Sequence, residues 1–320
     1  MTRCAILILI ALFISTTASA QTAENYYKAG EKKYDAKSYA EAIEDFTQAI
    51  LLNPNQAHVY VFRGVCFNAL NKNEEAIKDY DKAIGLNPKT KEAHYFKGIS
   101  LFEISQYKEA INEFSEVIML DPTEAKAYNN RGMCYKNKGK LYFALIDFYD
   151  AIRIDSKYAE AYYNIGTTRL LMDGCKCAID DFTQAIAIDS TFINAYNNRG
   201  NCFKKQGLPV AAISDYSKAI GLSKSFPGHD LVLFYNNRGS SYNAIERFED
   251  AIRDFDAAIQ IEPDFADAYN NRGLVWLSLN KFDEAIKDFN QTLALNPKHP
   301  DAKRNIKKVY TKKKKRLFTI

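Results

Sequence analysis

The chain has 320 residues, 47% of them hydrophobic and 26% charged, which is the composition of a folded protein rather than a disordered or polytopic membrane protein. Its formal charge of +4 is unevenly distributed, because residues 303–320 contain nine basic and no acidic side chains, whereas residues 21–302 contain 33 basic and 39 acidic ones. Nucleic-acid-binding surfaces need clustered lysine and arginine, so this acidic body argues against a nucleic-acid partner.

The first twenty residues have the pattern of a secretory signal peptide. Arg3 is basic, residues 5–13 are apolar, and Ala18-Ser19-Ala20 is a small-residue cleavage pattern. Nine apolar residues are too few to span a bilayer, and Cys4 precedes the apolar run, whereas a lipid-bearing cysteine follows it. We therefore expect residues 1–20 to be removed and the protein to be exported, either periplasmic or secreted.

Cysteines are few in the expected mature chain. They are Cys66, Cys134, Cys175, Cys177 and Cys202. In an oxidising compartment an odd number leaves at least one unpaired thiol. The C-x-C spacing of Cys175 and Cys177 lacks the matching pair that a metal site needs, and the four histidines are scattered. We therefore expect no metal and no cofactor, and packing is the favoured interpretation of the cysteines; whether any of them form disulfides stays open.

An internal repeat of 34 residues runs from Ala23 onward. Glycine recurs at Gly30, Gly64, Gly98, Gly132, Gly166, Gly200, Gly239 and Gly273. Alanine follows twelve residues later at Ala42, Ala76, Ala110, Ala144, Ala178, Ala212, Ala251 and Ala285. An aromatic ring follows four residues after that at Phe46, Tyr80, Phe114, Phe148, Phe182, Tyr216, Phe255 and Phe289. Five units close with proline.

These spacings predict two helices in each unit. The first helix carries a ring, a glycine and a large side chain at i, i+4 and i+7, and the second carries alanine, a ring and a small residue at the same spacing. Glycine and alanine let the two helices approach closely while the rings fill the space beside them. Since neither helix buries its apolar stripe alone, the units must stack on one another.

The pattern resembles the tetratricopeptide repeat. It matches the period of that family and its order of aromatic, Gly, Ala, aromatic, Ala and Pro. The resemblance implies an all-α, right-handed superhelical solenoid of eight helix-turn-helix units with a C-terminal capping helix. We assign residues 23–226 to units one to six, 227–231 to an insert, 232–299 to units seven and eight, and 300–320 to a capping helix and basic tail. Pro227 and Gly228 predict a loop at the insert.

Little of the chain lies outside the repeats. The remainder beyond the signal peptide, the repeats and their insert is too short to hold a catalytic domain. The repeats also contain no P-loop, G-x-S-x-G or H-E-x-x-H motif. We therefore expect the protein not to be an enzyme.

Charged residues recur at fixed positions, counted from the first residue of each unit. Position 7 is basic in six units, and position 23 is acidic in all eight. One interpretation is a charged ligand surface. The favoured one is a ladder of ion pairs that ties each first helix to its second helix, because a ligand surface rarely neutralises itself.

Asparagine recurs on the first helices of the later units, at position 6 in five units and at position 5 in four of them. These candidate groove residues are Asn129, Asn130, Asn164, Asn197, Asn198, Asn236, Asn237, Asn270 and Asn271. Similar repeats in O-linked N-acetylglucosamine transferase hold an extended peptide with such a row, and a carboxamide both donates and accepts hydrogen bonds. The alternative is that each asparagine bonds a neighbouring repeat, and the two interpretations stay open.

The first three units differ at the groove positions. They carry apolar side chains that suggest an aromatic, apolar trough, at Tyr27, Tyr34, Val61, Phe62, Tyr95, Phe96 and Phe102. For Phe62 and Phe96 a place in the core is an equal alternative. Co-chaperones of the family bind a C-terminal carboxylate through lysine, arginine and asparagine. Asp267 and Asn271 stand here where basic residues are needed, so that activity is not expected.

The sequence therefore predicts a non-catalytic scaffold that binds an extended protein or peptide ligand in a concave groove. The alternative is an envelope-assembly or structural factor that contacts a membrane or cell-wall polymer through the basic tail. The sequence names neither the partner nor the oligomeric state.

Overall fold

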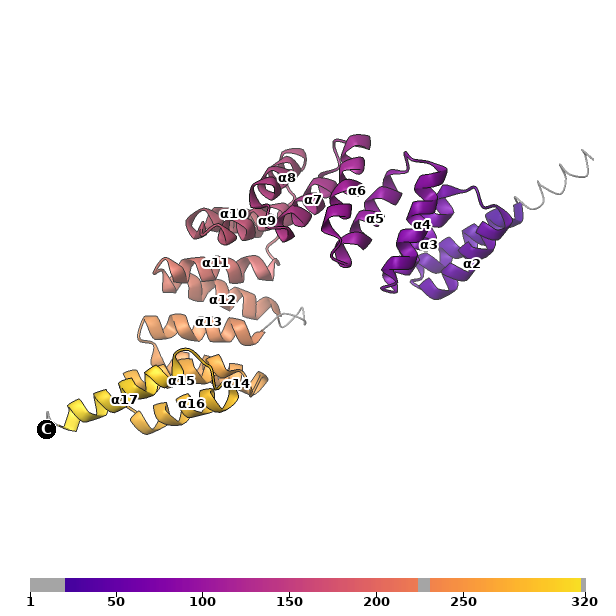
Figure 1. Cartoon of the computed structure of the whole chain (residues 1–320). Helices are drawn as coiled ribbons and strands as arrows, with labels where there is room; N and C mark the ends of the chain where they lie inside the picture. The colour runs from indigo at the N-terminus through magenta and orange to yellow at the C-terminus, as the bar shows by residue number, and fades with distance from the viewer. Residues whose placement is uncertain (1–20, 224–230, 318–320) are drawn as a thin grey trace, which may run out of the picture. The chain divides into compact units, whose positions relative to one another are not determined.

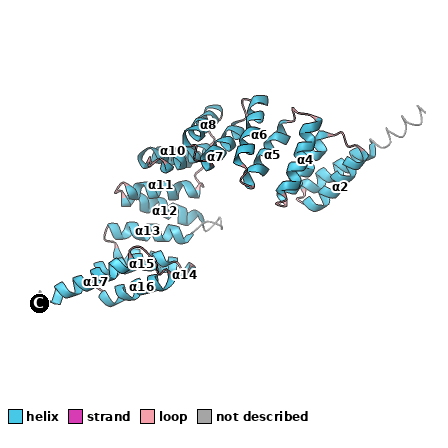
Figure 2. Cartoon of the chain, viewed as in Figure 1, coloured by secondary structure: helices cyan, strands magenta, loops and turns pink. Residues whose placement is uncertain are grey.

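The computed structural model describes residues 21–223 and 231–317. The predicted signal peptide and residues 227–230 of the predicted insert lie outside these ranges. Every regular element within them is a helix, which confirms the all-α prediction (Figure 2). In the described ranges no helix combines the length and the apolar character that a bilayer span requires. The chain divides into two compact bodies, one ending at Ser156 and one beginning at Lys157.

The N-terminal body begins with a helix at residues 21–35. It continues with α2 (Tyr39–Leu52), α3 (Ala57–Ala69), α4 (Asn73–Leu86), α5 (Lys91–Glu103), α6 (Tyr107–Leu120), α7 (Ala125–Asn137) and α8 (Leu141–Ile154).

The C-terminal body contains the remaining helices (Figure 1). They are α9 (Ala159–Leu171), α10 (Cys175–Ile188), α11 (Ile193–Lys205), α12 (Pro209–Ser223), α13 (Leu231–Ala244), α14 (Phe248–Ile261), α15 (Ala266–Ser278), α16 (Phe282–Leu295) and α17 (Ala302–Leu317).

Within each body the first helices of successive units lie closer together than the second helices. Helix α3 contacts α5 and α5 contacts α7, while α11, α13, α15 and α17 form a second contacting series. No two successive second helices of the described residues make comparable contacts. The first helices therefore line the inner side of each body, which is where the sequence places the asparagine row.

The core of every unit is the contact between its glycine and its ring. A Cβ atom placed on Gly166 would lie 2.7 Å from Cε1 of Phe182, and the corresponding distances in the other units are between 2.6 and 2.9 Å. The rings themselves are fully buried. The predicted close approach of the two helices is therefore confirmed in all eight units, and it explains why glycine is needed there.

The turn inside each unit has one residue in the left-handed region, at position 15. Glycine occupies it in only two units, at Gly139 and Gly207. In the other six units φ lies between 57° and 61° at a residue with a side chain, namely Lys37, Asn71, Ser105, Asp173, Glu246 and Asn280. A non-glycine residue in this region carries a conformational cost of about 1 kcal/mol.

The turns between units depend on asparagine or aspartate as well as on proline. In unit five, where Ser190 replaces the expected proline, the Asp189 carboxylate accepts hydrogen bonds from the backbone N–H and the hydroxyl of Thr191. The same Asx turn is present at Asn87, which precedes Pro88. This local hydrogen bonding explains why loss of the proline does not disrupt the repeat.

Candidate peptide-binding face

The arginine and aspartate residues of the repeat form the predicted ladder. In unit two, Arg63 donates from Nε and Nη2 to the two carboxylate oxygens of Asp79, at 2.8 and 2.7 Å. Its Nη1 donates to the Thr47 hydroxyl of the preceding unit at 3.0 Å. Four further pairs repeat this bidentate geometry, namely Arg131 with Asp147, Arg199 with Asp215, Arg238 with Asp254 and Arg272 with Asp288. These charges stabilise the array and are not arranged to bind a ligand.

Units with a different residue at position 7 pair their acidic residue in another way. Asp181 forms an ion pair with Arg169, which lies one helical turn after position 7 of unit five. In unit three, Lys97 and His94 both contact Glu113. The internal charge balance is therefore kept even where the repeat sequence varies.

Asparagine amides join successive first helices. The Nδ2 atoms of Asn130 and Asn198 donate to the hydroxyls of Tyr95 and Tyr163, each at 3.2 Å. The Nδ2 atom of Asn271 donates to Oδ1 of Asn236 at 2.9 Å. Position 6 of one unit thus bonds position 5 of the preceding unit, so the interpretation that the asparagines bond neighbouring repeats is confirmed at these three junctions.

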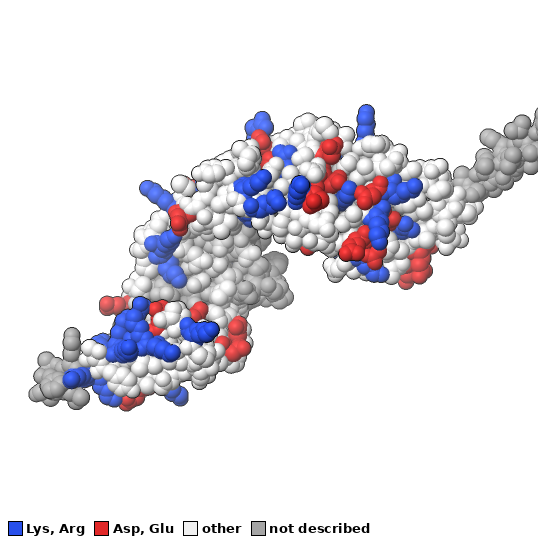
Figure 3. All heavy atoms as spheres, in the orientation of Figure 1, with Lys and Arg blue, Asp and Glu red and all other residues white. Residues whose placement is uncertain are grey.

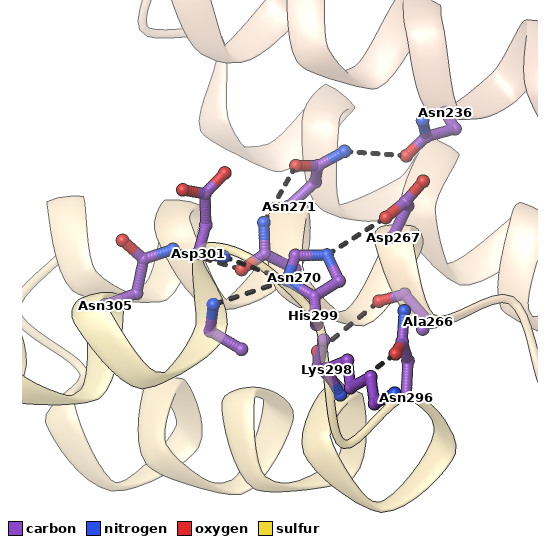
Figure 4. A network of polar contacts seen from close by, with 12 residues as sticks. Asn236, Ala266, Asp267, Asn270, Asn271, Asn296, Lys298, His299, Asp301 and Asn305 are labelled. Carbon is purple, nitrogen blue, oxygen red and sulfur yellow. Dashed lines mark hydrogen bonds and ion pairs between the residues drawn. The ribbon is translucent and has the colours of Figure 1, made fainter.

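This series of amide bonds extends into the last helix (Figure 4). Asn305 of α17 donates to Oδ1 of Asn270 at 3.0 Å, and Nδ2 of Asn270 contacts Oδ1 of Asn271 at 3.4 Å. Asn305 occupies the place of position 6 in a ninth unit. Helix α17 therefore caps the array by imitating a first helix.

The nine candidate residues are not equally accessible. The side chains of Asn129, Asn164 and Asn270 are buried. The other six are partly exposed, namely Asn130, Asn197, Asn198, Asn236, Asn237 and Asn271. A carboxamide can make up to about four hydrogen bonds, so a bond to the neighbouring unit does not exhaust the hydrogen-bonding capacity of these six.

Helix α11 adds polar groups that the sequence interpretation did not single out as a cluster. Asn197, Asn201 and Lys204 follow one another at i, i+4 and i+7 and thus lie on one face. The Oδ1 atom of Asn197 is buried and has no hydrogen-bond partner in the described part of the chain. Burial lowers the pKa of the Lys204 amine, whose Nζ lies 3.4 Å from Oδ1 of Asn237 on α13. A carboxylate placed beside this amine would compensate for the lost hydration.

Two aromatic side chains of the first three units, Phe62 and Phe96, pack against the core. Phe62 makes edge contacts with the rings of Tyr27 and Tyr34. Phe96 stacks on the ring of Tyr80 and packs against the core of units one and two. The core interpretation thus holds for Phe62 and Phe96, which are partly buried against the core. The row itself reaches Tyr95, whose hydroxyl accepts from Asn130.

Helix α8 presents an apolar surface that the repeat pattern did not reveal. Tyr142, Phe143 and Ile146 are 73%, 56% and 57% exposed, although Phe148 of the same helix is fully buried. The corresponding positions of α4 hold Glu74, Glu75 and Lys78. The helix is therefore apolar on two faces, and only the repeat register identifies the core-facing one.

Basic side chains gather around α17 (Figure 3). Its exposed residues include Lys303, Arg304, Lys307, Lys308 and Lys314. A shallow depression is lined by Arg304, Lys307, Lys308, Thr311 and Lys312. In the described ranges no group of three or more histidine, cysteine, aspartate or glutamate side chains could hold a metal ion.

Three sequence profiles of tetratricopeptide or TPR repeats match the chain. One matches residues 57–90, 193–226 and 266–299, a second matches 98–139 and 239–278, and a third matches 125–158. Together they span more than half of the sequence. A search of curated proteins finds no match.

Solved structures show the same fold. The Cut9–Hcn1 hetero-tetramer of the APC/C has a TM-score of 0.59 at 16% identity, and the match covers 85% of this chain and 52% of that one. The C-terminal part of a TPR repeat-containing protein from Cytophaga hutchinsonii has a TM-score of 0.56 at 18% identity, with 88% and 99% covered. MamA from Desulfovibrio magneticus RS-1 has a TM-score of 0.51 at 23% identity, with 53% and 97% covered. From its repeats, its core contacts and these matches, the chain belongs to the tetratricopeptide repeat family.

Proposed function

We propose that this protein-binding scaffold holds an extended peptide segment along α11, α13 and α15 of the C-terminal body. The single observation that carries the proposal is the amide row on these helices, in which Asn197, Asn198, Asn236, Asn237 and Asn271 are partly exposed. Packed helices lie about 10 Å apart, and an extended chain advances about 3.3 Å per residue. One amide group per unit therefore meets about every third residue of the ligand.

The proposed ligand carries an acidic residue. Lys204 is partly buried and lies beside Asn237, and its lowered pKa reflects lost hydration. A carboxylate from an acidic side chain or a C-terminus would restore a favourable environment for the charged amine. Backbone binding by the amides and one charge contact at Lys204 together define an extended, acidic peptide.

A library of displayed nonapeptides provides the test. Peptides selected on the wild-type protein are measured against the double variant Asn198→Ala/Asn237→Ala and against Glu249→Ala, an exposed change on the second helix α14. Each lost amide bond removes about 0.5 to 1.5 kcal/mol, so we expect the double variant to bind about 5- to 150-fold more weakly. Glu249→Ala should bind as the wild type does.

Two further measurements separate ligand binding from a purely structural role. N-methylation of the peptide backbone should weaken binding more than scrambling the side chains that do not face Lys204. Lys204→Met should weaken only the acidic peptides. If the double variant loses thermal stability but keeps its affinity for peptides, the amides serve only to join the units, and the proposal is wrong.

A second candidate function is contact with an anionic membrane or cell-wall polymer. The observation that favours it is the exposed basic face of α17. Asp301, the acidic residue just before this helix, forms an ion pair with Arg304. Its test is binding to vesicles with and without anionic lipid and to isolated cell-wall polymer, compared between the full chain and a variant with Lys303, Lys307 and Lys308 changed to glutamine. Equal binding by the two proteins would exclude this role.

The proposed setting is outside the cytoplasm. The proposal is supported by the basic, apolar and small-residue segments of residues 1–20. Fractionation of cells producing the full chain, with N-terminal sequencing of the product, should give a protein that begins at Gln21 in the periplasm or the medium. An uncleaved chain in the cytoplasm would contradict export.

A further inference from the structure

Two cysteine thiols meet at the junction of units five and six. Cys175 is in the first turn of α10 and Cys202 is in the last turn of α11. Their Sγ atoms lie 3.1 Å apart. Both residues belong to the C-terminal body, and both pack in the cluster formed by Ala178, Phe182 and Ala185. The packing of the repeat therefore holds two nucleophilic sulfur atoms in contact.

The repeat register explains this contact. Position 17 of one unit packs in the same cluster as position 10 of the next unit at several junctions. The pairs are Tyr39 with Cys66, Tyr107 with Cys134, Phe248 with Val275 and Phe282 with Val309. At the junction of units five and six the same two positions are both cysteine. Cys66 and Cys134 thus share a cluster with an aromatic ring from position 17, whereas Cys202 contacts a second thiol.

We propose that Cys175 and Cys202 form a disulfide bond that links units five and six. A disulfide joins two sulfur atoms at about 2.05 Å, so the bond requires a shift of about 1 Å. Cys175 stands at the position where four other units carry an aromatic ring, namely Tyr39, Tyr107, Phe248 and Phe282, so this junction lacks a ring contact there. The covalent bond replaces that contact.

The two thiols have different roles in forming the bond. Cys175 is partly exposed, whereas Cys202 is fully buried. Burial, with the neighbouring thiol as a smaller cause, raises the pKa of Cys202 to about 12. Cys175 is therefore the sulfur atom that reacts first with an oxidant from solution.

The oxidant is an external disulfide, either a low-molecular-weight one or that of a thiol oxidoreductase. The Cys175 thiolate attacks one sulfur of this disulfide, which gives a mixed disulfide and releases one thiolate. The Cys202 thiol transfers its proton to that thiolate and attacks Sγ of Cys175, and the second external thiolate leaves. This second thiolate takes up the proton that the Cys175 thiol lost when it ionised. Two cysteine thiols are thus oxidised, and the external disulfide is reduced to two thiols.

Oxidised glutathione is the probe for the test. The reduced full-length protein is incubated with it, quenched by acid, unfolded and titrated for free thiols, and its tryptic peptides are analysed without reduction. We expect the loss of two thiols and a cross-linked peptide pair that contains Cys175 and Cys202. Cys177→Ser is the matched control, because this exposed neighbour should not change the result. In the Cys175→Ser variant, the buried thiols of Cys66, Cys134 and Cys202 should all stay reduced.

Thermal unfolding gives an independent readout. A cross-link that closes a loop of this length should raise the Tm of the oxidised protein by about 5 to 10 °C. The increase should be reversed by dithiothreitol and be absent in Cys202→Ser. That variant is expected to fold, because serine is fully buried at the equivalent position in units three and seven, at Ser100 and Ser241.

Three results would overturn the proposal. The first is a wild-type protein that keeps all its thiols under these conditions. The second is a cross-link that uses Cys177, whether within one chain or between two chains. The third is a stable glutathione adduct on Cys175 that Cys202 does not displace.

Discussion

Two units have a tyrosine where the other six have phenylalanine as the central ring. The hydroxyl of Tyr216 donates to Oδ1 of Asn201 at 2.8 Å. The hydroxyl of Tyr80 is buried without a hydrogen-bond partner in the described ranges, because Val65 stands where Asn201 stands in unit six. Burial raises the pKa of both phenols. The same residue type is thus satisfied in one unit and unsatisfied in another.

Removing these hydroxyl groups should have opposite effects. Tyr216→Phe loses a hydrogen bond and leaves the Asn201 carbonyl with one fewer partner, so we expect a loss of about 1 kcal/mol in the free energy of unfolding. Tyr80→Phe removes a buried group that has no partner, so stability should be unchanged or higher. Denaturant unfolding of the two variants measures both values. Equal losses in the two would show that the Tyr80 hydroxyl has a partner.

His94 occupies a position that tyrosine holds in the other units. The tyrosines at 60 and 269 donate to the carbonyls of Pro54 and Pro263, and Nε2 of His94 lies 3.1 Å from the carbonyl of Pro88. Its Nδ1 lies 2.7 Å from the Glu113 carboxylate. Both partners are acceptors, so the imidazole is best satisfied with both nitrogens protonated. The bond to Glu113 raises the pKa of His94 against the opposing effect of burial.

This raised pKa predicts a pH dependence of stability. The folded state binds the proton more tightly than the unfolded state does, so the contribution is complete below the ordinary histidine pKa of about 6.5. It is lost as the pH rises through the higher pKa of the folded state. We expect the Tm of the wild type to fall between about pH 6 and pH 8 more than that of His94→Tyr. Parallel curves for the two proteins would contradict this assignment.

Helix pairing depends on the glycine of each first helix. A methyl group on Gly166 would meet the ring of Phe182, whereas one on Gly221 of α12 would meet no atom within 4 Å. We expect Gly166→Ala to lower the free energy of unfolding by about 1 to 3 kcal/mol through overpacking. Gly221→Ala, the control, should raise it by about 0.5 to 1 kcal/mol through helix propensity. A stable Gly166→Ala protein would disprove the repeat register.

Much of the element structure can be predicted from the sequence, because the 34-residue period fixes which residues must be buried. The role of the asparagines cannot be predicted in this way, since an amide suits a neighbouring repeat as well as a ligand. The contact of Cys175 with Cys202 also escapes prediction, because it depends on how successive units pack. Helix α8 is ambiguous in isolation, since Tyr142 and Phe148 are equally plausible core residues until the register separates them.

On the scale of the whole molecule, stability is spread over contacts between neighbouring units. Helix α17 covers the end of the array, where Val309 is fully buried and packs with Phe282 and Phe289. Ile306 of the same helix packs against this cluster. Each unit depends directly on its neighbours only.

Deletion of residues 300–320 should therefore have a local effect. We expect faster amide hydrogen exchange in α15 and α16, which lose their cover, and unchanged exchange in α11 and α12. The substitution of lysines 303, 307 and 308 by glutamine keeps the helix and should leave exchange in α15 and α16 slow. Uniformly faster exchange in the deletion variant would show that the C-terminal body unfolds as one cooperative unit.

The left-handed turn residue at position 15 has a consequence for the evolution of such a chain. All eight residues at this position are exposed, and six of them adopt a backbone conformation that glycine would adopt with less cost. A substitution at one of these turns can thus raise or lower the stability of a single unit. The same substitution leaves the side chains of the inner face unchanged. The stability of a unit and the side chains of its inner face therefore depend on separate positions, so one can change without altering the other.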